Sequence, residues 1–355
     1  MVSSGMVRTH DPASQSIASP SAGAQSDPLS DVLQAVRLTG ALFFRVEASR
    51  PWGIDVPEAA AFGSLILPRS AAIISYHVVL EGTGWVTMPG AEPVRFGPGD
   101  VLIFPHGDPY CMKSTPEVAA EYSKDEAVAF FRDMAAGRLP FDVVEGGGDP
   151  PITRYVCGYL GCDGRPFNPV LSALPRFLRV RRSSAAEPDL LDRMLDLALA
   201  RPDLGDPGSA NVRLRLCELV FVEALRRYLG GLSGTAGGWF AGLRDPTVGR
   251  ALALLHADPA RPWTLNALAR AAGTSRAVLA ARFAGGVGCP PMQYLTRWRM
   301  QCAARRLDEP GARVAAIAHA VGYESEAAFC RAFKKAAGLS PASWRSRTAG
   351  ALSPH

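Results

Sequence analysis

The chain has 355 residues, enough for two or three domains with cores of their own. Hydrophobic residues make up 48% and charged residues 20%, as in an ordinary globular protein, and no apolar run reaches the roughly 18 to 20 residues of a membrane span. No signal peptide is recognisable, and seven widely spread cysteines do not form a disulfide framework. We therefore expect a cytoplasmic protein without a membrane partner.

The net charge of +5 is unevenly distributed. From Arg244 to the end the chain holds 16 Lys and Arg against 6 Asp and Glu, a balance of +10. The remainder holds 22 and 27, a balance of −5. Positive charge thus gathers in the C-terminal third, as phosphate binding would require. A solvated basic face is the alternative at this point.

In chain order, residues 1–27 are rich in Ser, Ala, Pro and Gln and predict a disordered tail. Residues 28–182 contain short apolar runs punctuated by Gly, Pro and Asp, which predict many short strands and hence a sandwich or a barrel. The segment 116–148 interrupts this pattern, and its first part is helix-like or mobile.

Residues 183–230 predict a pair of amphipathic helices, at 189–200 and 210–228. These helices could complete a core or form a dimer interface, and we favour a homodimer. Glycines recur in residues 231–243, which predicts a linker.

Residues 244–348 contain the same helical hairpin pattern twice, about 50 residues apart, and residues 349–355 are a tail. Each copy predicts a short helix, a Gly turn and a second helix, the unit that places a helix in the DNA major groove. A long helix at 291–307 connects the copies, and the second recognition helix is expected at 324–337. The matching pairs are Gly273 and Gly322, Phe283 and Phe333, Gly288 and Gly338, Pro291 and Pro341, and Tyr294 and Trp344.

This region resembles the DNA-binding domain of the AraC/XylS family of transcription regulators, most specifically in AVGYESEAAFCRAFKKAAGLSPASWR. The resemblance implies control of transcription at bacterial promoters, with double-stranded DNA as partner and RNA polymerase as a further candidate. Activation and repression both stay open. Recognition-helix residues contact bases in this family. Carried onto this sequence, those positions are Glu326, Ala327, Cys330, Arg331 and Lys334 in the second unit, with Ser275, Arg276 and Arg282 in the first.

Their chemistry suggests roles for these residues. Arg331 could grip a guanine through two hydrogen bonds, and Glu326 could accept one from cytosine, whereas Lys334 suits a phosphate. In the first unit, small alanines would face the DNA groove. We therefore expect this unit to recognise DNA shape or phosphate groups, with weak base specificity. On the connecting helix, Arg297, Arg299 and Arg305 could contact phosphate or serve the fold. The alternative for all of them is the solvated face of a helix.

The stretch GPGDVLIFPHGDPY resembles the second sequence motif of cupins, which are small β-barrels, and YHVVLEGTGWVTMPG resembles the strand pair before it. The fold class that follows is an α+β multidomain chain. It has an N-terminal cupin-like β-barrel with a helical pair, and a C-terminal all-α double helix-turn-helix. The barrel would detect a signal or contact a partner.

Cupins often hold a metal through histidines, but Tyr110 stands where the motif would place one. His77, His106, Cys157 and Cys162 remain as candidates for zinc, for oxidant sensing or for a small-molecule effector. Five residues apart on a strand, the two cysteines would point to opposite faces. We favour ordinary buried thiols and a turn histidine, and no cofactor is certain.

Two other classes of protein are alternatives to a transcription regulator. A cupin enzyme would need a complete metal triad, and the chain shows no P-loop, nucleophile elbow or HExxH motif, so we expect no enzyme. A DNA binder without sequence preference is the second rival, which the sensor-like barrel disfavours.

Overall fold

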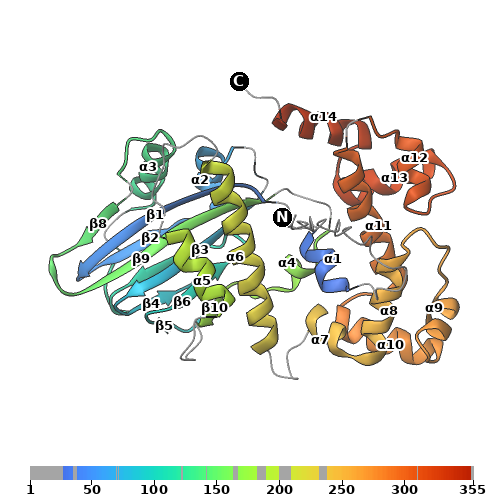
Figure 1. Ribbon diagram of the computed structural model, residues 1–355, viewed down its shortest axis with the longest axis horizontal. Helices are drawn as coiled ribbons and strands as arrows, with labels where there is room; N and C mark the ends of the chain where they lie inside the picture. The colour runs from blue at the N-terminus through green and yellow to red at the C-terminus, as the bar shows by residue number, and fades with distance from the viewer. Residues whose placement is uncertain are drawn as a thin grey trace, which may run out of the picture.

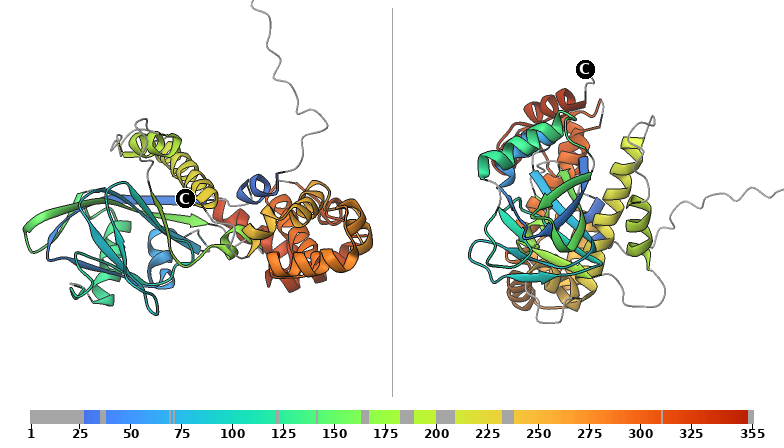
Figure 2. Two further views of the ribbon diagram at one scale, coloured as in Figure 1. Left: turned by 90° about the horizontal axis from the view of Figure 1, so that it is seen from below. Right: turned by 90° about the vertical axis from the view of Figure 1, so that its left-hand side faces the viewer.

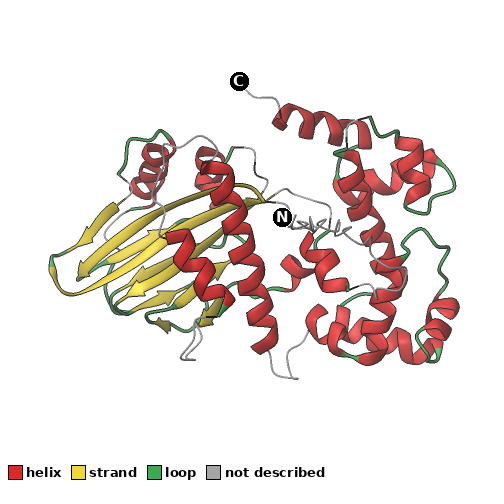
Figure 3. Ribbon diagram, in the orientation of Figure 1, coloured by secondary structure: helices red, strands yellow, loops and turns green. Residues whose placement is uncertain are grey.

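The computed structural model describes residues 27–34, 38–68, 70, 72–120, 123–140, 142–162, 167–181, 189–199, 209–231, 238–309 and 311–352. The predicted tail at 1–27 lies outside this range except for Asp27. A β-rich half and a helical half lie side by side (Figures 1 and 3).

The β-rich half consists of two sheets. The larger has the strand order β10-β6-β3-β9-β1-β8 and the smaller β2-β7-β4-β5. Their bounds are β1 (Leu38–Arg50), β2 (Gly53–Val56), β3 (Ala72–Glu81), β4 (Gly84–Thr87), β5 (Val94–Phe96), β6 (Asp100–Phe104), β7 (Tyr110–Lys113), β8 (Asp142–Gly146), β9 (Asp149–Cys162) and β10 (Leu178–Arg181). Among the described residues the strands form two separate sheets and no closed barrel, so the β-rich half predicted from the sequence is a two-sheet sandwich.

Two helices contribute to the core between the sheets. Helix α2 (Ala59–Ile66) packs on α3 (Lys124–Ala135), and their Phe62 and Phe131 rings stack with centroids 4.0 Å apart. Both rings belong to the core between the sheets, which also contains Phe44 of β1 and Tyr159 of β9. The helices therefore add apolar surface to the core between the sheets.

The outer face of the larger sheet is covered by α5 (Leu190–Leu199) and α6 (Ser209–Gly231), which lie along one side of the strands (Figure 2). Leu191 and Phe221 of these helices pack in one core with Ile74, Val101 and Leu160 of the strands. Because β3, β6 and β9 are buried on both faces, their sequences read as nearly continuous apolar runs.

The helical half is built around α11 (Pro291–Leu307), with one helix pair at each of its ends (Figure 1). The first helix pair is α9 (Leu265–Ala271) and α10 (Arg276–Val287), and the second is α12 (Val314–Ala320) and α13 (Glu326–Ala337). The remaining helices are α7 (Trp239–Arg244), α8 (Pro246–Ala257) and α14 (Pro341–Leu352).

Most of helix α7 lies within residues 231–243, whose recurring glycines predicted a linker. Trp239 and Phe240 are buried, and the Trp239 indole donates a hydrogen bond to the Tyr294 hydroxyl at 3.2 Å. These two aromatic side chains tie the segment to the first helix pair, whereas residues 232–237 of the predicted linker lie outside the described residues.

The two halves meet through α1 (Pro28–Gln34) and α4 (Pro169–Ala173), which pack on α8 and α7 respectively. The buried His256 ring lies 3.3 Å from an Asp31 carboxylate oxygen and 2.8 Å from the Tyr294 hydroxyl. Burial lowers the pKa of His256, although the Asp31 carboxylate opposes this shift. One apolar core, from Val32 to Trp298, continues through this contact.

Candidate functional site

The two helix pairs share their turn chemistry. Gly273 follows α9 with φ +74° and Gly322 follows α12 with φ +81°, a backbone region that favours glycine. The hydroxyls of Ser275 and Ser325 then accept hydrogen bonds from backbone N–H groups of α10 and α13. Two residues lie between Gly322 and Ser325 and one lies between Gly273 and Ser275, so the second turn is one residue longer.

The two pairs also share their core contacts. Phe283 of α10 meets Tyr294 edge-on with ring centroids 5.7 Å apart, and Phe333 of α13 meets Trp344 in the same way at 5.7 Å. All four side chains are buried. The aromatic residues that match between the two sequence copies therefore occupy equivalent packing positions in the two helix pairs.

Helix α13 turns a polar face outward. Glu326, Ala327, Arg331 and Lys334 are exposed, and among the described residues none forms a hydrogen bond or ion pair with Arg331. Cys330 is half-buried against the core of the second pair, and burial followed by the nearby Glu326 charge raises the pKa of its thiol. The helix begins at Glu326 rather than 324 because Ser325 caps it.

The first helix pair offers fewer free side chains. Arg276 is exposed at the start of α10. Arg282 donates to the Thr247 hydroxyl at 3.2 Å and lies 3.5 Å from Asp245, so it holds α8, while Ser275 caps its own helix. Two of the three positions carried over from the family thus have partners within the fold.

The arginines of α11 differ from one another. Arg299 donates to the carbonyl oxygens of Pro259 at 2.7 Å and Gly322 at 3.3 Å, and burial lowers the pKa of its guanidinium. Arg297 lies over the Phe167 ring at 5.6 Å. Arg305 is exposed. Arg299 therefore has a structural role, because its hydrogen bond to the Gly322 carbonyl holds the turn of the second helix pair.

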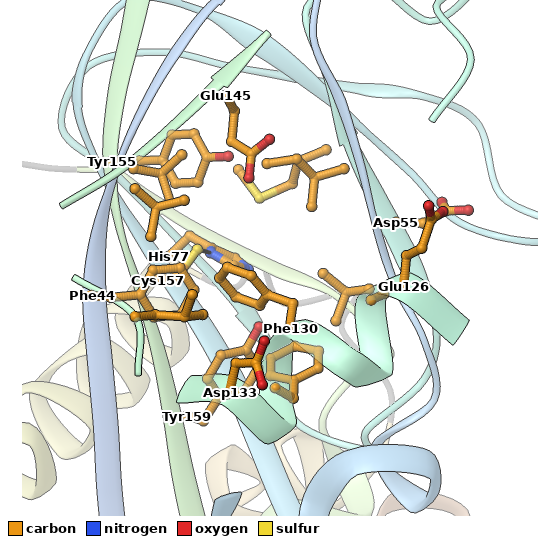
Figure 4. A pocket seen from close by; sticks show the side chains of 18 of the residues that line it. Phe44, Asp55, His77, Glu126, Phe130, Asp133, Glu145, Tyr155, Cys157 and Tyr159 are labelled. Carbon is orange, nitrogen blue, oxygen red and sulfur yellow. Dashed lines mark hydrogen bonds between the residues drawn. The ribbon is translucent and has the colours of Figure 1, made fainter. Parts of the chain in front are cut away.

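A second feature, which the sequence did not reveal, is a cavity of about 320 Å³ between the sheets (Figure 4). Strands β1, β2, β3, β7, β8 and β9 and helix α3 line it with mainly apolar side chains. The sequence of α3 was helix-like, but only the folded chain brings that helix over the sheets.

At the inner wall of the cavity His77 is held between two partners. Its Nδ1 lies 2.9 Å from the Cys157 sulfur and its Nε2 lies 2.6 Å from the Tyr110 hydroxyl. Burial lowers the pKa of His77 to about 3 and raises the pKa of the Cys157 thiol well above its usual value. At neutral pH His77 is therefore an uncharged imidazole and Cys157 a protonated thiol. The Tyr110 hydroxyl is hydrogen-bonded to Nε2 of His77, the nitrogen that a metal would need.

The other two candidates lie elsewhere. The His106 ring hydrogen-bonds to the Leu174 carbonyl at 2.9 Å, and Cys162 belongs to the core on the outer face of the sheet. The described part of the chain holds no group of three His, Cys, Asp or Glu side chains that could bind a metal ion. A zinc site needs at least three protein ligands, so the residues present do not fit zinc. The high pKa of Cys157 likewise disfavours oxidant sensing there.

Comparison with known proteins gives the family. A cupin family model matches residues 27–230, and a helix-turn-helix domain model matches residues 268–347. An AraC-like transcription regulator from Streptomyces lividans is 32% identical over 324 residues, which cover 90% of this chain and 98% of that one. A second such regulator, from Streptomyces antibioticus, is 31% identical, with 90% and 98% covered.

Among solved structures, the DNA-binding domain of AdpA in complex with a target DNA is 27% identical, with a TM-score of 0.29, and the match covers 30% of this chain and 96% of that one.

The chain belongs to the AraC-like transcription regulators. It combines a cupin N-terminal domain with a helix-turn-helix DNA-binding domain. Both relatives are regulators rather than enzymes. None of the described helices is long and apolar enough to cross a membrane.

Proposed function

We propose that the protein is a sequence-specific regulator that reads two successive major grooves of promoter DNA, with α10 in one groove and α13 in the next. The repeated turn and core geometry carries this proposal, because each pair then forms a helix-turn-helix unit. Helix α11 has 17 residues and is therefore about 25 Å long, which suits units one DNA turn, roughly 34 Å, apart.

The two units would contribute unequally. In α13, Arg331 is free to contact a guanine, Glu326 a cytosine and Lys334 a phosphate. In α10, Arg276 is exposed without a partner among the described residues, whereas Arg282, although also exposed, is paired with Asp245. We therefore expect the first unit to discriminate only weakly between bases.

Replacing Arg331 with alanine is expected to lower discrimination at one base position by about 1–3 kcal/mol. The test uses the duplex that the wild-type chain enriches from a random pool, together with its single-base variants. Lys334→Ala, the control on the same helix, should weaken all duplexes alike and reduce the salt slope by about 1. An Arg331→Ala loss that is uniform across sequences would refute the assignment.

The domain division is also a proposal. We assign 28–182 to the sensor, 183–230 to the helical pair and 244–348 to DNA binding, with α7 added to the last because its aromatic side chains are buried there. A fragment 238–352 is expected to fold and bind DNA at low salt. A fragment starting at residue 245 should melt at a lower temperature because it lacks Trp239 and Phe240. Equal melting temperatures in calorimetry would contradict this role for α7.

We also propose that the helical pair forms a homodimer. Leu190 and Leu197 of α5, and Val212 and Leu219 of α6, are 51% to 61% exposed, at a spacing of seven residues on each helix. Such a spacing places each pair on one side of its helix, opposite the buried side chains.

Leu219→Glu should therefore abolish the dimer, because it places a charge in the apolar contact. Analytical ultracentrifugation is expected to give twice 37.7 kDa for the wild-type chain and 37.7 kDa for the variant. Val144→Glu, at a 75% exposed site on β8, is the control and should stay dimeric. A monomeric wild-type chain at all concentrations would exclude this interface.

Modulation by a signal is the last part of the proposal. The cavity between the sheets would hold an effector, and the packed contact of α1 and α4 with α7 and α8 would pass its effect to the first helix pair. RNA polymerase stays a candidate partner on family grounds alone.

A further inference from the structure

Arg299 lies on α11 at the boundary between the two helix pairs. The core that contains the first pair extends along α11 as far as Trp298, and the core of the second pair begins at Met300. Among the described residues only the half-buried Cys302 packs against both cores. Both pairs thus share α11, but apolar packing does little to fix one pair relative to the other.

The guanidinium of Arg299 joins a loop before the first pair to the turn of the second pair. Its Nε donates a hydrogen bond to the Pro259 carbonyl at 2.7 Å. One terminal nitrogen donates to the Arg261 carbonyl at 2.9 Å and to the Ala260 carbonyl at 3.5 Å. The other terminal nitrogen donates to the Gly322 carbonyl at 3.3 Å. A guanidinium can reach several carbonyls at once because its donors form a planar fork, which the ammonium group of a lysine lacks.

Each end of this contact is attached to a helix pair. The loop 258–264 leads directly into α9, where the Thr264 hydroxyl caps the helix, and Trp263 of the loop is buried in the core of the first pair. Gly322 forms the turn between α12 and α13. A movement of the second pair relative to the first would therefore break the hydrogen bonds of Arg299.

The two turn glycines differ in what surrounds them. A Cβ atom at Gly322 would lie 2.5 Å from the Ala260 carbonyl oxygen and 2.7 Å from a terminal nitrogen of Arg299. A Cβ atom at Gly273 would meet no atom within 4 Å among the described parts of the chain beyond its own turn. Both glycines have a positive φ, so the backbone strain of an alanine is common to the two positions. The close approach of a second backbone segment is particular to Gly322, where the two pairs meet.

We propose that Arg299 is a positioning residue that holds the second helix pair against the first and thereby sets the distance between half-sites that the protein accepts. This inference rests on the proposed reading of two successive grooves. Because α10 and α13 must enter grooves about one DNA turn apart, a second pair that could move would tolerate half-sites lying closer together or further apart. The donors of Arg299 are directed at backbone carbonyls, so its effect on DNA is exerted through the two pairs.

Duplexes that differ only in the distance between the half-sites test this role on the full-length chain. The original is the duplex that the wild-type chain enriches from a random pool. Inserting or removing one base pair between its half-sites displaces one of them by about 3.4 Å and rotates it by about 34°. The wild-type chain should bind both altered duplexes about tenfold or more weakly than the original. Arg299→Lys, which keeps the charge and loses the fork, should bind the original more weakly and lose roughly threefold or less on the altered duplexes.

The repeat supplies a second, independent pair of variants. Gly322→Ala should weaken the dependence on half-site distance as Arg299→Lys does, because its Cβ displaces the loop at Ala260. Gly273→Ala carries the same backbone strain without that clash, so it should lower the affinity for all three duplexes by the same factor. Arg306→Lys, at an exposed position of α11, is the control for the lysine substitution and should keep the wild-type preference.

The outcomes separate failure of this inference from failure of the proposed function. If Arg299→Lys keeps the wild-type affinity and distance preference, a positive charge alone is sufficient, as for a phosphate contact, and the inference fails while the reading of two grooves stands. If Arg299→Lys loses affinity equally for all three duplexes, Arg299 only stabilises the fold, and the inference again fails. A wild-type chain that binds all three duplexes equally well would overturn both.

Discussion

Replacing Phe333 with alanine is expected to destabilise the second helix pair by about 3–5 kcal/mol, since truncating a buried phenylalanine leaves a cavity. Phe333 is fully buried, with ring centroids 5.6 Å from Phe329 and 5.7 Å from Trp344. The core around it is small and separate from the core that contains the first pair, so the loss should stay local.

Hydrogen exchange is the suitable measurement, because a multidomain chain need not unfold in one step. Amides of α12, α13 and α14 should exchange about 100-fold faster or more, while those of α9 and α10 change little. DNA binding should fall to that of a single unit. Lys335→Ala, on the exposed side of α13, is the control. Equal acceleration in both pairs would show that the two cores are one cooperative unit.

The second large expected effect is a loss of folding stability at acidic pH. Burial lowers the pKa of His77 in the folded chain to about 3, whereas the unfolded chain binds a proton near pH 6.5. Between these values the unfolded state binds more protons, so stability falls as pH falls. The contribution is complete above about pH 6.5 and is lost at about 1.4 kcal/mol per pH unit below it, until roughly pH 3. The lowered pKa of His256 acts in the same direction.

Urea unfolding between pH 7 and pH 5 measures this effect against His77→Gln, which cannot titrate. The wild-type chain should lose about 2 kcal/mol more than the variant over this interval. The groups that contact His77, Cys157 and Tyr110, stay protonated there because burial raises the pKa of both. His319→Gln, on the exposed side of α12, is the control. Parallel pH profiles of the wild-type chain and His77→Gln would contradict a neutral buried His77.

The repeated helix pairs could be predicted from sequence because their determinants are local. A glycine at the turn and a buried phenylalanine each act locally, so Gly322 and Phe333 were sufficient to predict the second pair, although the cap at Ser325 was missed and the helix start was placed two residues early. The helix at 291–307 was placed correctly for the same reason, since Pro291 begins it.

The parts that could not be predicted depend on distant contacts. The sequence predicted the β-rich half but not its division into two sheets, because strand pairing between distant parts of the chain decides that division. Helix α7 was missed because glycines dominate its surroundings, whereas Trp239 is held by Tyr294, 55 residues away. Similarly, the cavity between the sheets forms only when α3 packs over them.

The most direct test of the account is selection of bound duplexes from a random DNA pool by the full-length wild-type chain, Arg331→Ala and Arg276→Ala. We predict one motif with two half-sites about one helical turn, roughly 10 base pairs, apart. Arg331→Ala should blur one position in one half, and Arg276→Ala should lower affinity with little change of motif. If the wild-type chain enriches no motif, or the same motif emerges unchanged from Arg331→Ala, reading of two grooves with α13 as the specific element is contradicted.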